Sequence, residues 1–247
     1  MTRILGLDVG SRTVDAIWLE HGSVVDSAVL DSGYDPQEVC AGLIARGGYD
    51  LLVATGYGRH AAVTNFGGKA VTEISAYARG AVELYPGVRS VLDIGGQDTK
   101  VMIISDDGRL TDFEMNDKCA AGTGRFLEVM AGTLGFDLEE IGDAALAADA
   151  GIRISAMCTV FAESEVTSLV HRGEDRGRMA LGLHEAVVSR TLSMLKRLGA
   201  RSPLVFAGGG AKNRALGELL RRDFVGEFLI TDNPQLVGAL GAALLGT

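Results

Sequence analysis

The chain has 247 residues, of which 47% are hydrophobic and 22% are charged, the balance of an ordinary globular protein. The formal net charge is −9 and the chain has no lysine- or arginine-rich run, which excludes electrostatic binding to nucleic acid or to an anionic membrane. No apolar run reaches the ~18 residues of a membrane span, and Asp8 interrupts the first apolar segment, so we expect a cytoplasmic protein.

The first 86 residues predict four strands and two helices. RILGLDV (3–9) is an apolar run that ends in an Asp-x-Gly turn, and VDAIWLE (14–20) and SVVDSAVL (23–30) predict two further strands. PQEVCAGLIARG (36–47) has helical spacing, with Val39, Leu43 and Ile44 on one face. LLVAT (51–55) predicts a short strand before the glycine turn of ATGYGRH, and a helix at 72–85 ends before Pro86.

The same order of elements returns about 85 residues downstream. VRSVLDIGGQDTKVMIIS (88–105) and DDGRLTDFEM (106–115) predict strand, Asp-x-Gly turn, strand, tight turn and strand. An echo at this spacing indicates two related α/β domains rather than a solenoid, whose repeats are roughly 20 to 50 residues long. We expect domains at 1–86 and 87–234, with the last helix (235–247) packing back on the first.

The remaining chain is predicted to be mostly helical up to residue 200, with its longest amphipathic stretch at 181–199. LVFAGGG (204–210) predicts a strand that enters a triple glycine, and a helix follows it. The final helix (234–246) is rich in small residues, which permit close packing.

Three glycine turns each follow an apolar strand: Gly10 with Ser11 and Thr13, Gly95 with Gly96, and Gly208 to Gly210. Glycine allows the backbone N–H groups to approach phosphate oxygens closely. A single Asp-x-Gly is most often a tight hairpin turn, but three glycine turns after apolar strands, two of them with an aspartate just before, favour a nucleotide site. Neither a P-loop nor a G-x-G-x-x-G fingerprint is present, so the site belongs to another class.

Cys40, Cys119 and Cys158 are odd in number and widely spaced, which does not fit a disulfide framework. We interpret Cys119 and Cys158 as each opening a helix, where a negative group meets free N–H groups and the positive helix end. An iron–sulfur cluster takes four cysteines, so two identical chains would be needed. The alternative is that both are buried apolar residues, which is also our expectation for Cys40.

The segments LGLDVGSRT, VLDIGGQDTK and VFAGGGAKN resemble the phosphate-1, phosphate-2 and adenosine motifs of the actin, hexokinase and Hsp70 superfamily. This resemblance implies an α/β fold of two RNase H-like domains that clasp Mg-ATP in the cleft between them. Carried over to this chain, it implies that Asp8, Asp93 and Gln97 are catalytic, next to the metal, the attacking water and the γ-phosphate. The implied nucleotide-binding residues are Gly10, Ser11, Arg12, Thr13, Gly95, Gly96, Gly208, Gly209, Gly210 and Asn213.

A second resemblance covers essentially the whole chain. NDKCAAGTGRFLEVMA, CTVFAESEV, LDIGGQD and ATGYGR together are similar to the ATP-dependent activators of 2-hydroxyacyl-CoA dehydratases, with related motifs in benzoyl-CoA reductase ATPase subunits. The resemblance implies a homodimer bridged by one [4Fe-4S] cluster on Cys119 and Cys158 of each subunit. It also implies reduction by a ferredoxin or flavodoxin, and ATP-driven transfer of one electron to an iron–sulfur dehydratase.

Three other functions remain open at this point. The chain could serve a benzoyl-CoA reductase or another cluster protein, it could be a small-molecule kinase of the same fold with buried cysteines, or it could be a nucleotide-gated scaffold. Glu163 and Glu165, which follow Cys158, could position water or Mg²⁺, although solvated helix carboxylates are the commoner case.

Overall fold

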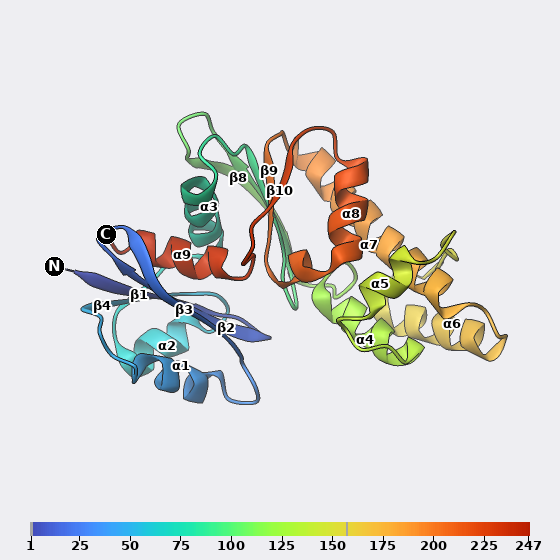
Figure 1. The fold of residues 1–247 in the computed structure, drawn as a ribbon, viewed down its shortest axis with the longest axis horizontal. Helices are drawn as coiled ribbons and strands as arrows, with labels where there is room; N and C mark the ends of the chain where they lie inside the picture. The colour runs from blue at the N-terminus through green and yellow to red at the C-terminus, as the bar shows by residue number, and fades with distance from the viewer. Residues whose placement is uncertain (1, 157) are drawn as a thin grey trace. The chain divides into compact units, whose positions relative to one another are not determined.

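A computed structural model describes residues 2–156 and 158–247 of the chain (Figure 1). The chain divides into two compact units. Unit 1 contains the chain up to Val91, Met102–Phe113 and Thr231–Thr247, and unit 2 contains Leu92–Val101 and Glu114–Ile230. The boundaries that we expected at 1–86 and 87–234 stay a prediction.

Unit 1 is built on a five-stranded sheet in the order β3-β2-β1-β4-β5. β1 pairs antiparallel with β2, which pairs antiparallel with β3, while β4 lies parallel to β1. The predicted strand, turn and strand pattern is therefore confirmed, and the chain adds a two-residue strand that the sequence did not indicate. The strands are β1 (Arg3–Val9), β2 (Thr13–Glu20), β3 (Ser23–Asp31), β4 (Leu51–Thr55) and β5 (Lys69–Ala70).

Helices cover both faces of this sheet, because β1 is apolar on both sides. Leu5 and Leu7 share one core with Cys40 of α1, whereas Ile4 shares the other core with Ala239 of α9. α9 packs against α3, β1, β2 and β4. The helices of unit 1 are α1 (Pro36–Ile44), α2 (Arg59–Phe66), α3 (Glu73–Leu84) and α9 (Leu236–Leu244).

Small residues bring α9 and α3 into backbone contact. A Cβ at Gly241 would lie 1.7 Å from the Ala76 carbonyl oxygen, and one at Gly80 would lie 2.1 Å from the Val237 carbonyl oxygen. No side chain fits at either position, so these glycines are required for the close approach of the two helices.

The second sheet has the strand order β10-β9-β6-β7-β8, and β9 and β10 are parallel. It repeats the strand, turn and strand pattern of the first sheet at β6 to β8, as the sequence predicts. Its strands are β6 (Ser90–Ile94), β7 (Thr99–Ile104), β8 (Leu110–Asn116), β9 (Leu204–Ala207) and β10 (Phe228–Ile230).

The helices of unit 2 share one hydrophobic core with β6, β9 and β10. Within it, α7 contacts α4, α5 and α8, and α4 packs against α6. The elements are α4 (Gly124–Leu134), α5 (Ile141–Leu146), α6 (Thr159–His171), α7 (Arg176–Leu198), a 3₁₀ turn (Gly209–Lys212) and α8 (Arg214–Asp223). None of the helices in the described ranges is both long and apolar enough to cross a membrane.

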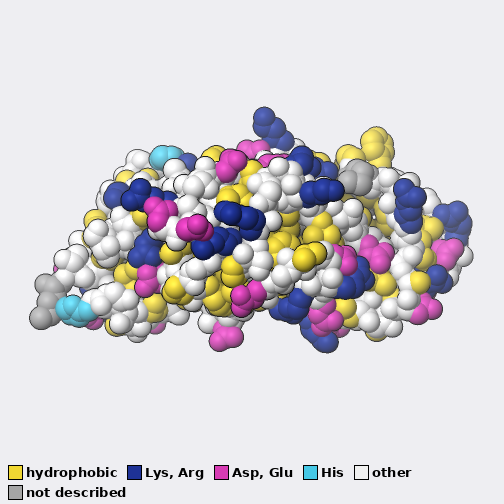
Figure 2. Space-filling view, turned by 90° about the horizontal axis from the view of Figure 1, so that it is seen from above, with side chains coloured by type: hydrophobic (Ala, Val, Ile, Leu, Met, Phe, Trp, Pro, Cys, Tyr) yellow, Lys and Arg dark blue, Asp and Glu magenta, His cyan; other side chains and the backbone are white. Residues whose placement is uncertain are grey.

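Acidic and basic side chains are interspersed over the face drawn in Figure 2, without a broad patch of one sign.

Candidate functional site

The turn between β1 and β2 is fixed by backbone hydrogen bonds of its own unit. The Gly10 N–H donates to the Thr13 carbonyl oxygen at 2.9 Å, and the Ser32 hydroxyl donates to the Gly10 carbonyl oxygen at 2.9 Å. Ser11 and Arg12 lie exposed at the tip. The turn is therefore preformed, and its side chains remain accessible to a ligand.

Asp8 lies near the end of β1, where two glycines leave room for its carboxylate. A Cβ at Gly56 would lie 2.4 Å from Asp8 Oδ1, and one at Gly238 would lie 2.1 Å from Asp8 Oδ2. The strand register places Asp15 directly opposite Asp8, and both side chains are buried. The sequence analysis missed Asp15, which brings a second buried carboxylate to the same hairpin.

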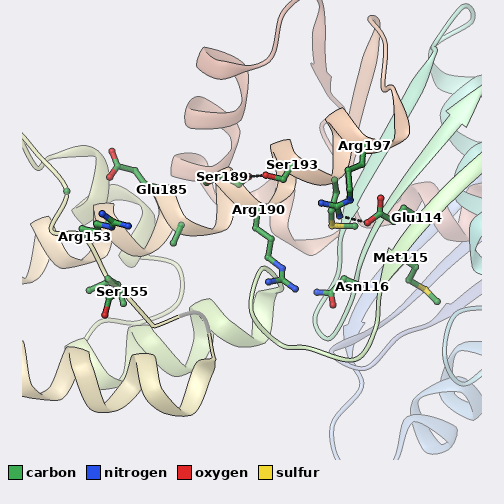
Figure 3. Close-up of a pocket in the computed structure, with 15 residues that line it drawn as sticks. Glu114, Met115, Asn116, Arg153, Ser155, Glu185, Ser189, Arg190, Ser193 and Arg197 are labelled. Carbon is green, nitrogen blue, oxygen red and sulfur yellow. Dashed lines mark hydrogen bonds and ion pairs between the residues drawn. The ribbon is translucent and has the colours of Figure 1, made fainter.

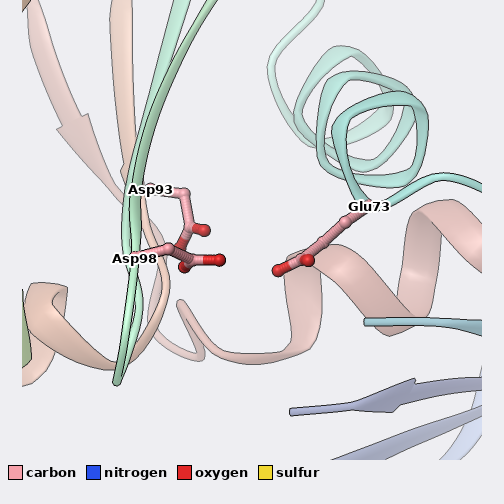
Figure 4. Close-up of side chains that lie close together, drawn as sticks. All are labelled: Glu73, Asp93 and Asp98. Atoms are coloured by element: carbon pink, nitrogen blue, oxygen red, sulfur yellow. The ribbon is translucent and has the colours of Figure 1, made fainter. Parts of the chain in front are cut away.

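In unit 2, Asp93 and Asp98 form the second carboxylate group, and their oxygens lie within 4.8 Å of each other (Figure 4). The Lys100 ammonium binds both carboxylates, at 3.0 Å from Asp93 Oδ2 and 2.6 Å from Asp98 Oδ1. Lys100 is fully buried in β7. A buried charge of this kind is tolerated because it is paired, so Lys100 is part of the site although the sequence analysis did not select it.

The second and third glycine turns lie together beside Asp93. The Gly95 N–H donates to the Asp98 carbonyl oxygen at 2.9 Å, which closes the turn after β6. Gly208 has a φ of +78°, and a Cβ there would lie 1.9 Å from Asp93 Oδ1. Gln97 and Gly209 are exposed. Unit 2 thus brings together the predicted residues Asp93, Gly95, Gly96, Gln97 and Gly208 to Gly210.

Asn213 is held inside unit 2 by both ends of its carboxamide. Its Oδ1 accepts the Leu216 N–H at 3.0 Å, which caps α8, and its Nδ2 donates to His184 Nε2 at 3.0 Å. Burial lowers the pKa of His184, and its Nδ1 donates to the Ala180 carbonyl oxygen at 2.7 Å, so the ring is neutral. Asn213 therefore shapes the turn after Gly210, and His184, to which the sequence analysis gave no role, fixes Asn213.

Cys119 does not open a helix, which corrects the sequence-based interpretation. α4 begins at Gly124, five residues later, with Thr123 as its N-cap residue. The intervening segment is folded back by side-chain bonds, since Asn116 Nδ2 donates to the Cys119 carbonyl oxygen at 2.9 Å and Thr123 Oγ1 donates to the Ala120 carbonyl oxygen at 2.7 Å. Cys119 is half-buried with a free thiol.

The first residues of α4 are bound to the glycine turn after β6. The Gly124 N–H donates to the Gly95 carbonyl oxygen at 2.9 Å, and the Arg125 N–H donates to the Gly96 carbonyl oxygen at 2.8 Å. Thr99 Oγ1, on the strand after the turn, donates to the Gly122 carbonyl oxygen at 2.7 Å. The Cys119 segment and the Gly95–Gly96 turn therefore form one hydrogen-bonded body, and these two N–H groups are not available to a cluster.

Cys158 is the N-cap residue of α6, as the sequence indicates, and its thiol is free and exposed. The segment before it is held by Glu165, which accepts hydrogen bonds from the Ser155 and Ala156 N–H groups at 2.9 Å. Burial raises the pKa of Glu165, but these hydrogen bonds outweigh that effect and hold it below its ordinary value. Glu165 thus binds the chain ahead of Cys158. Cys40 is buried, as expected.

Two solved structures of dehydratase activators resemble the whole chain. One is the activator of the 2-hydroxyisocaproyl-CoA dehydratase from Clostridium difficile with bound ADPNP: 39% identity, a TM-score of 0.89, and coverage of 99% of this chain and 94% of that one. The other is component A of the Acidaminococcus fermentans (R)-2-hydroxyglutaryl-CoA dehydratase, with 36% identity, a TM-score of 0.92, and coverage of 100% and 98%.

A ROK family glucokinase from Streptomyces griseus, in complex with glucose and AMPPNP, covers 99% of both chains with a TM-score of 0.62 and 12% identity. At that identity it shows the fold alone, which is consistent with the predicted α/β fold class. Residues 5–246 match the BadF/BadG/BcrA/BcrD ATPase family. The chain therefore belongs to this family of ATPases.

Proposed function

We propose that the chain is an ATP-driven activator that delivers single electrons to a 2-hydroxyacyl-CoA dehydratase through a [4Fe-4S] cluster shared by two copies of the chain. The two most similar structures described above are activators of such dehydratases. The observation that carries the proposal is the hydrogen bonding of the Gly95–Gly96 turn to the first residues of α4, because it connects a phosphate-binding turn to a cysteine segment.

We propose that each unit carries a glycine turn suited to phosphate oxygens. Gly10, Ser11, Arg12 and Thr13 would bind phosphate oxygens from unit 1, while Gly95, Gly96 and Gly208 to Gly210 would do so from unit 2. Asp8, Asp93 and Gln97 would act on the hydrolysed phosphate and its attacking water. Asp93 and Asp98 offer the oxygen donors that Mg²⁺ prefers, and Lys100 limits the repulsion between them.

The two cysteine segments fit a shared iron–sulfur cluster in their chemistry. Cys119 and Cys158 are free and accessible thiols, which are soft ligands suited to iron–sulfur clusters. Each chain supplies two of the four ligands that a cluster takes, so a second copy would complete the site. Val160 and Phe161, in the first turn of α6, are 66% and 69% exposed and offer apolar surface beside Cys158. When bound, such a cluster supplies one-electron redox chemistry.

The coupling of the nucleotide to the cysteines would run through named bonds of unit 2. A γ-phosphate bound at Gly95 and Gly96 would affect the positions of Gly122, Gly124 and Arg125. All three are hydrogen-bonded to the turn or to the strand that follows it. Loss of that phosphate on hydrolysis would relax the same bonds. We propose a ferredoxin or flavodoxin as the electron donor and the dehydratase as the acceptor.

The proposal is tested by iron and acid-labile sulfide per chain in protein purified without oxygen, together with the native mass. About two irons per chain in a dimer are expected. Cys119→Ser and Cys158→Ser are expected to lose the iron, whereas Cys40→Ser, which changes a buried thiol in unit 1, keeps it. ATP hydrolysis is measured on the same samples.

A colourless protein without iron after anaerobic reconstitution would overturn the cluster proposal. If such a protein also transferred phosphate to a small acceptor, the kinase alternative would replace it, and binding of ATP without hydrolysis would favour a scaffold. Electron transfer to a benzoyl-CoA reductase rather than to a dehydratase would keep the cluster and change the partner.

A further inference from the structure

Unit 2 contains a pocket of about 890 Å³ that the proposed nucleotide and cluster sites do not use (Figure 3). Its walls are the end of β8, the segment from Gly151 to Ser155, and one face of α7. His184 projects from the opposite face of α7, where it binds Asn213, so the pocket is separate from the adenosine-type turn. Its volume is in the range of sites that bind small organic ligands.

The charges on its walls favour an anion. Three arginines and two glutamates line the pocket, a net positive charge in a chain whose formal charge is −9. Arg197 is neutralised by an ion pair with Glu114. Within residues 2–156 and 158–247, neither Arg153 nor Arg190 forms an ion pair or a hydrogen bond. Both guanidinium groups can therefore bind a carboxylate or phosphate through their paired N–H donors.

The segments that carry the two arginines are packed within unit 2. The Ile152 N–H donates to the Arg178 carbonyl oxygen at 2.9 Å, and a Cβ at Gly182 would lie 1.9 Å from the Ile152 carbonyl oxygen, so the Arg153 segment lies directly on α7. Arg190 extends from α7 across the Cys119 segment, since a Cβ at Gly122 would lie 3.0 Å from its Cδ. Arg153 thus lies on a segment packed against α7, and Arg190 lies on α7 itself.

Two walls of the pocket are next to the segments that carry Cys119 and Cys158. Asn116, at the β8 edge of the pocket, donates to the Cys119 carbonyl oxygen. Ser155, on the other wall, precedes Cys158 by three residues and is held by Glu165. A ligand that bridges these walls would therefore restrain the two cysteine segments relative to each other.

We infer that this pocket binds a small anion carrying phosphate or carboxylate groups, held by Arg153 and Arg190. The inference rests on the proposed function only for its consequence: occupancy would stiffen the segments that bear Cys119 and Cys158. The binding itself depends on the arginines alone.

Calorimetric titration tests it on the full chain with saturating Mg-ADP, which occupies the nucleotide site. The probes are inorganic pyrophosphate, citrate and coenzyme A, so that phosphate and carboxylate ligands are distinguished. We expect at least one probe to bind, and Arg190→Gln or Arg153→Gln to weaken it about tenfold or more, the loss typical of a charged hydrogen-bond donor. The matched control is Arg178→Gln, on the same helix and paired with Asp149 outside the pocket.

The Arg190→Lys variant tests whether a loss of binding comes from a lost contact or from misfolding, because lysine keeps the charge and the apolar stem. We expect its affinity for the probe to lie between those of the parent chain and of Arg190→Gln. Failure of all three probes to bind the parent chain at millimolar concentration would overturn the inference, as would equal affinity in the Arg178→Gln and Arg190→Gln variants. Iron content is measured separately, so a chain without iron that binds a probe through Arg190 refutes the cluster proposal and leaves this one standing.

Discussion

Replacing Lys100 by methionine tests whether the buried ion pairs of unit 2 hold the Gly95–Gly96 turn. Lys100 Nζ lies 3.0 Å from Asp93 Oδ2 and 2.6 Å from Asp98 Oδ1. At an effective dielectric constant near 20, each contact is worth about 5–6 kcal/mol of Coulomb attraction. Desolvation of the three charges offsets much of it, and breaking a buried pair from one side typically costs about 3–5 kcal/mol. Methionine keeps the apolar stem, so the loss reports the charges.

Urea unfolding of Lys100→Met, followed by circular dichroism, is expected to show a loss of about 3–5 kcal/mol in the free energy of unfolding of unit 2. Lys196→Met, which removes an exposed lysine of α7, should stay within about 0.5 kcal/mol of the parent chain. A loss below about 1 kcal/mol in Lys100→Met would refute the reasoning, because it would mean that Asp93 and Asp98 are stable together without the ammonium.

Three further predictions use other parts of the chain. Gly241→Ala should destabilise the protein by about 1–3 kcal/mol through overpacking against α3, whereas Gly42→Ala, at an open position in α1, should stabilise it by about 0.5–1 kcal/mol; thermal unfolding compares them. Burial raises the pKa of Cys40 to about 11, so iodoacetamide at pH 8 should modify Cys158 and spare Cys40 until the chain unfolds, as mass spectrometry of the peptides would show. The pKa of Glu165 lies below its ordinary value of 4.5. The stability that this carboxylate contributes is therefore present above pH 4.5 and is lost as the pH falls through its pKa in the folded chain. In Glu165→Gln, hydrogen exchange of the amides before α6 should no longer show this acid dependence.

The strand pattern could be predicted because β1 to β3 and β6 to β8 are local structures. Each consists of apolar runs joined by tight turns, so the neighbour of each strand is its neighbour in the sequence. Asp15 could have been found in the same way. A turn centred at Ser11 and Arg12 makes Asp8 and Asp15 opposite residues in the hairpin, as the register confirms.

The start of α4 could not be placed correctly by looking for a functional cysteine. Thr123 is a favoured N-cap residue type, and it stands immediately before the helix. Reading the helix from Cys119 instead ignored this signal, and the small residues from Ala120 to Gly124 gave no apolar period to correct it. The residue type at the N-cap position was the better guide, although the Thr123 hydroxyl binds the Ala120 carbonyl oxygen and does not cap the helix.

Lys100 and His184 escaped prediction for a different reason, which is that their partners are set by tertiary contacts. Lys100 follows a turn whose shape determines that it reaches back to Asp93, and His184 meets Asn213 across 29 residues. One signal was available for Lys100. A lysine beside the apolar run Val101 to Ile104 in a buried strand requires a carboxylate partner, and Asp93 stands in the preceding strand.

The stretch of chain from Asp93 to Arg125 has two roles in the proposed function, one in nucleotide binding and one in positioning Cys119. Asp93, Gly95 and Gly96 are the residues proposed to bind the metal and the phosphate, and the same turn fixes α4 through its carbonyl oxygens. The Gly95 N–H is used inside the turn, by the Asp98 carbonyl oxygen, and the Gly95 and Gly96 carbonyl oxygens hold the helix, so the N–H groups of Gly96 and Gln97 are the ones proposed to bind a phosphate. A change in the conformation of the turn would displace its hydrogen bonds to α4. Thr99 and Thr123 attach the Cys119 segment to the same region, through the carbonyl oxygens of Gly122 and Ala120. In the proposed function, the Cys119 segment would therefore respond to phosphate binding at the Gly95–Gly96 turn through these few hydrogen bonds.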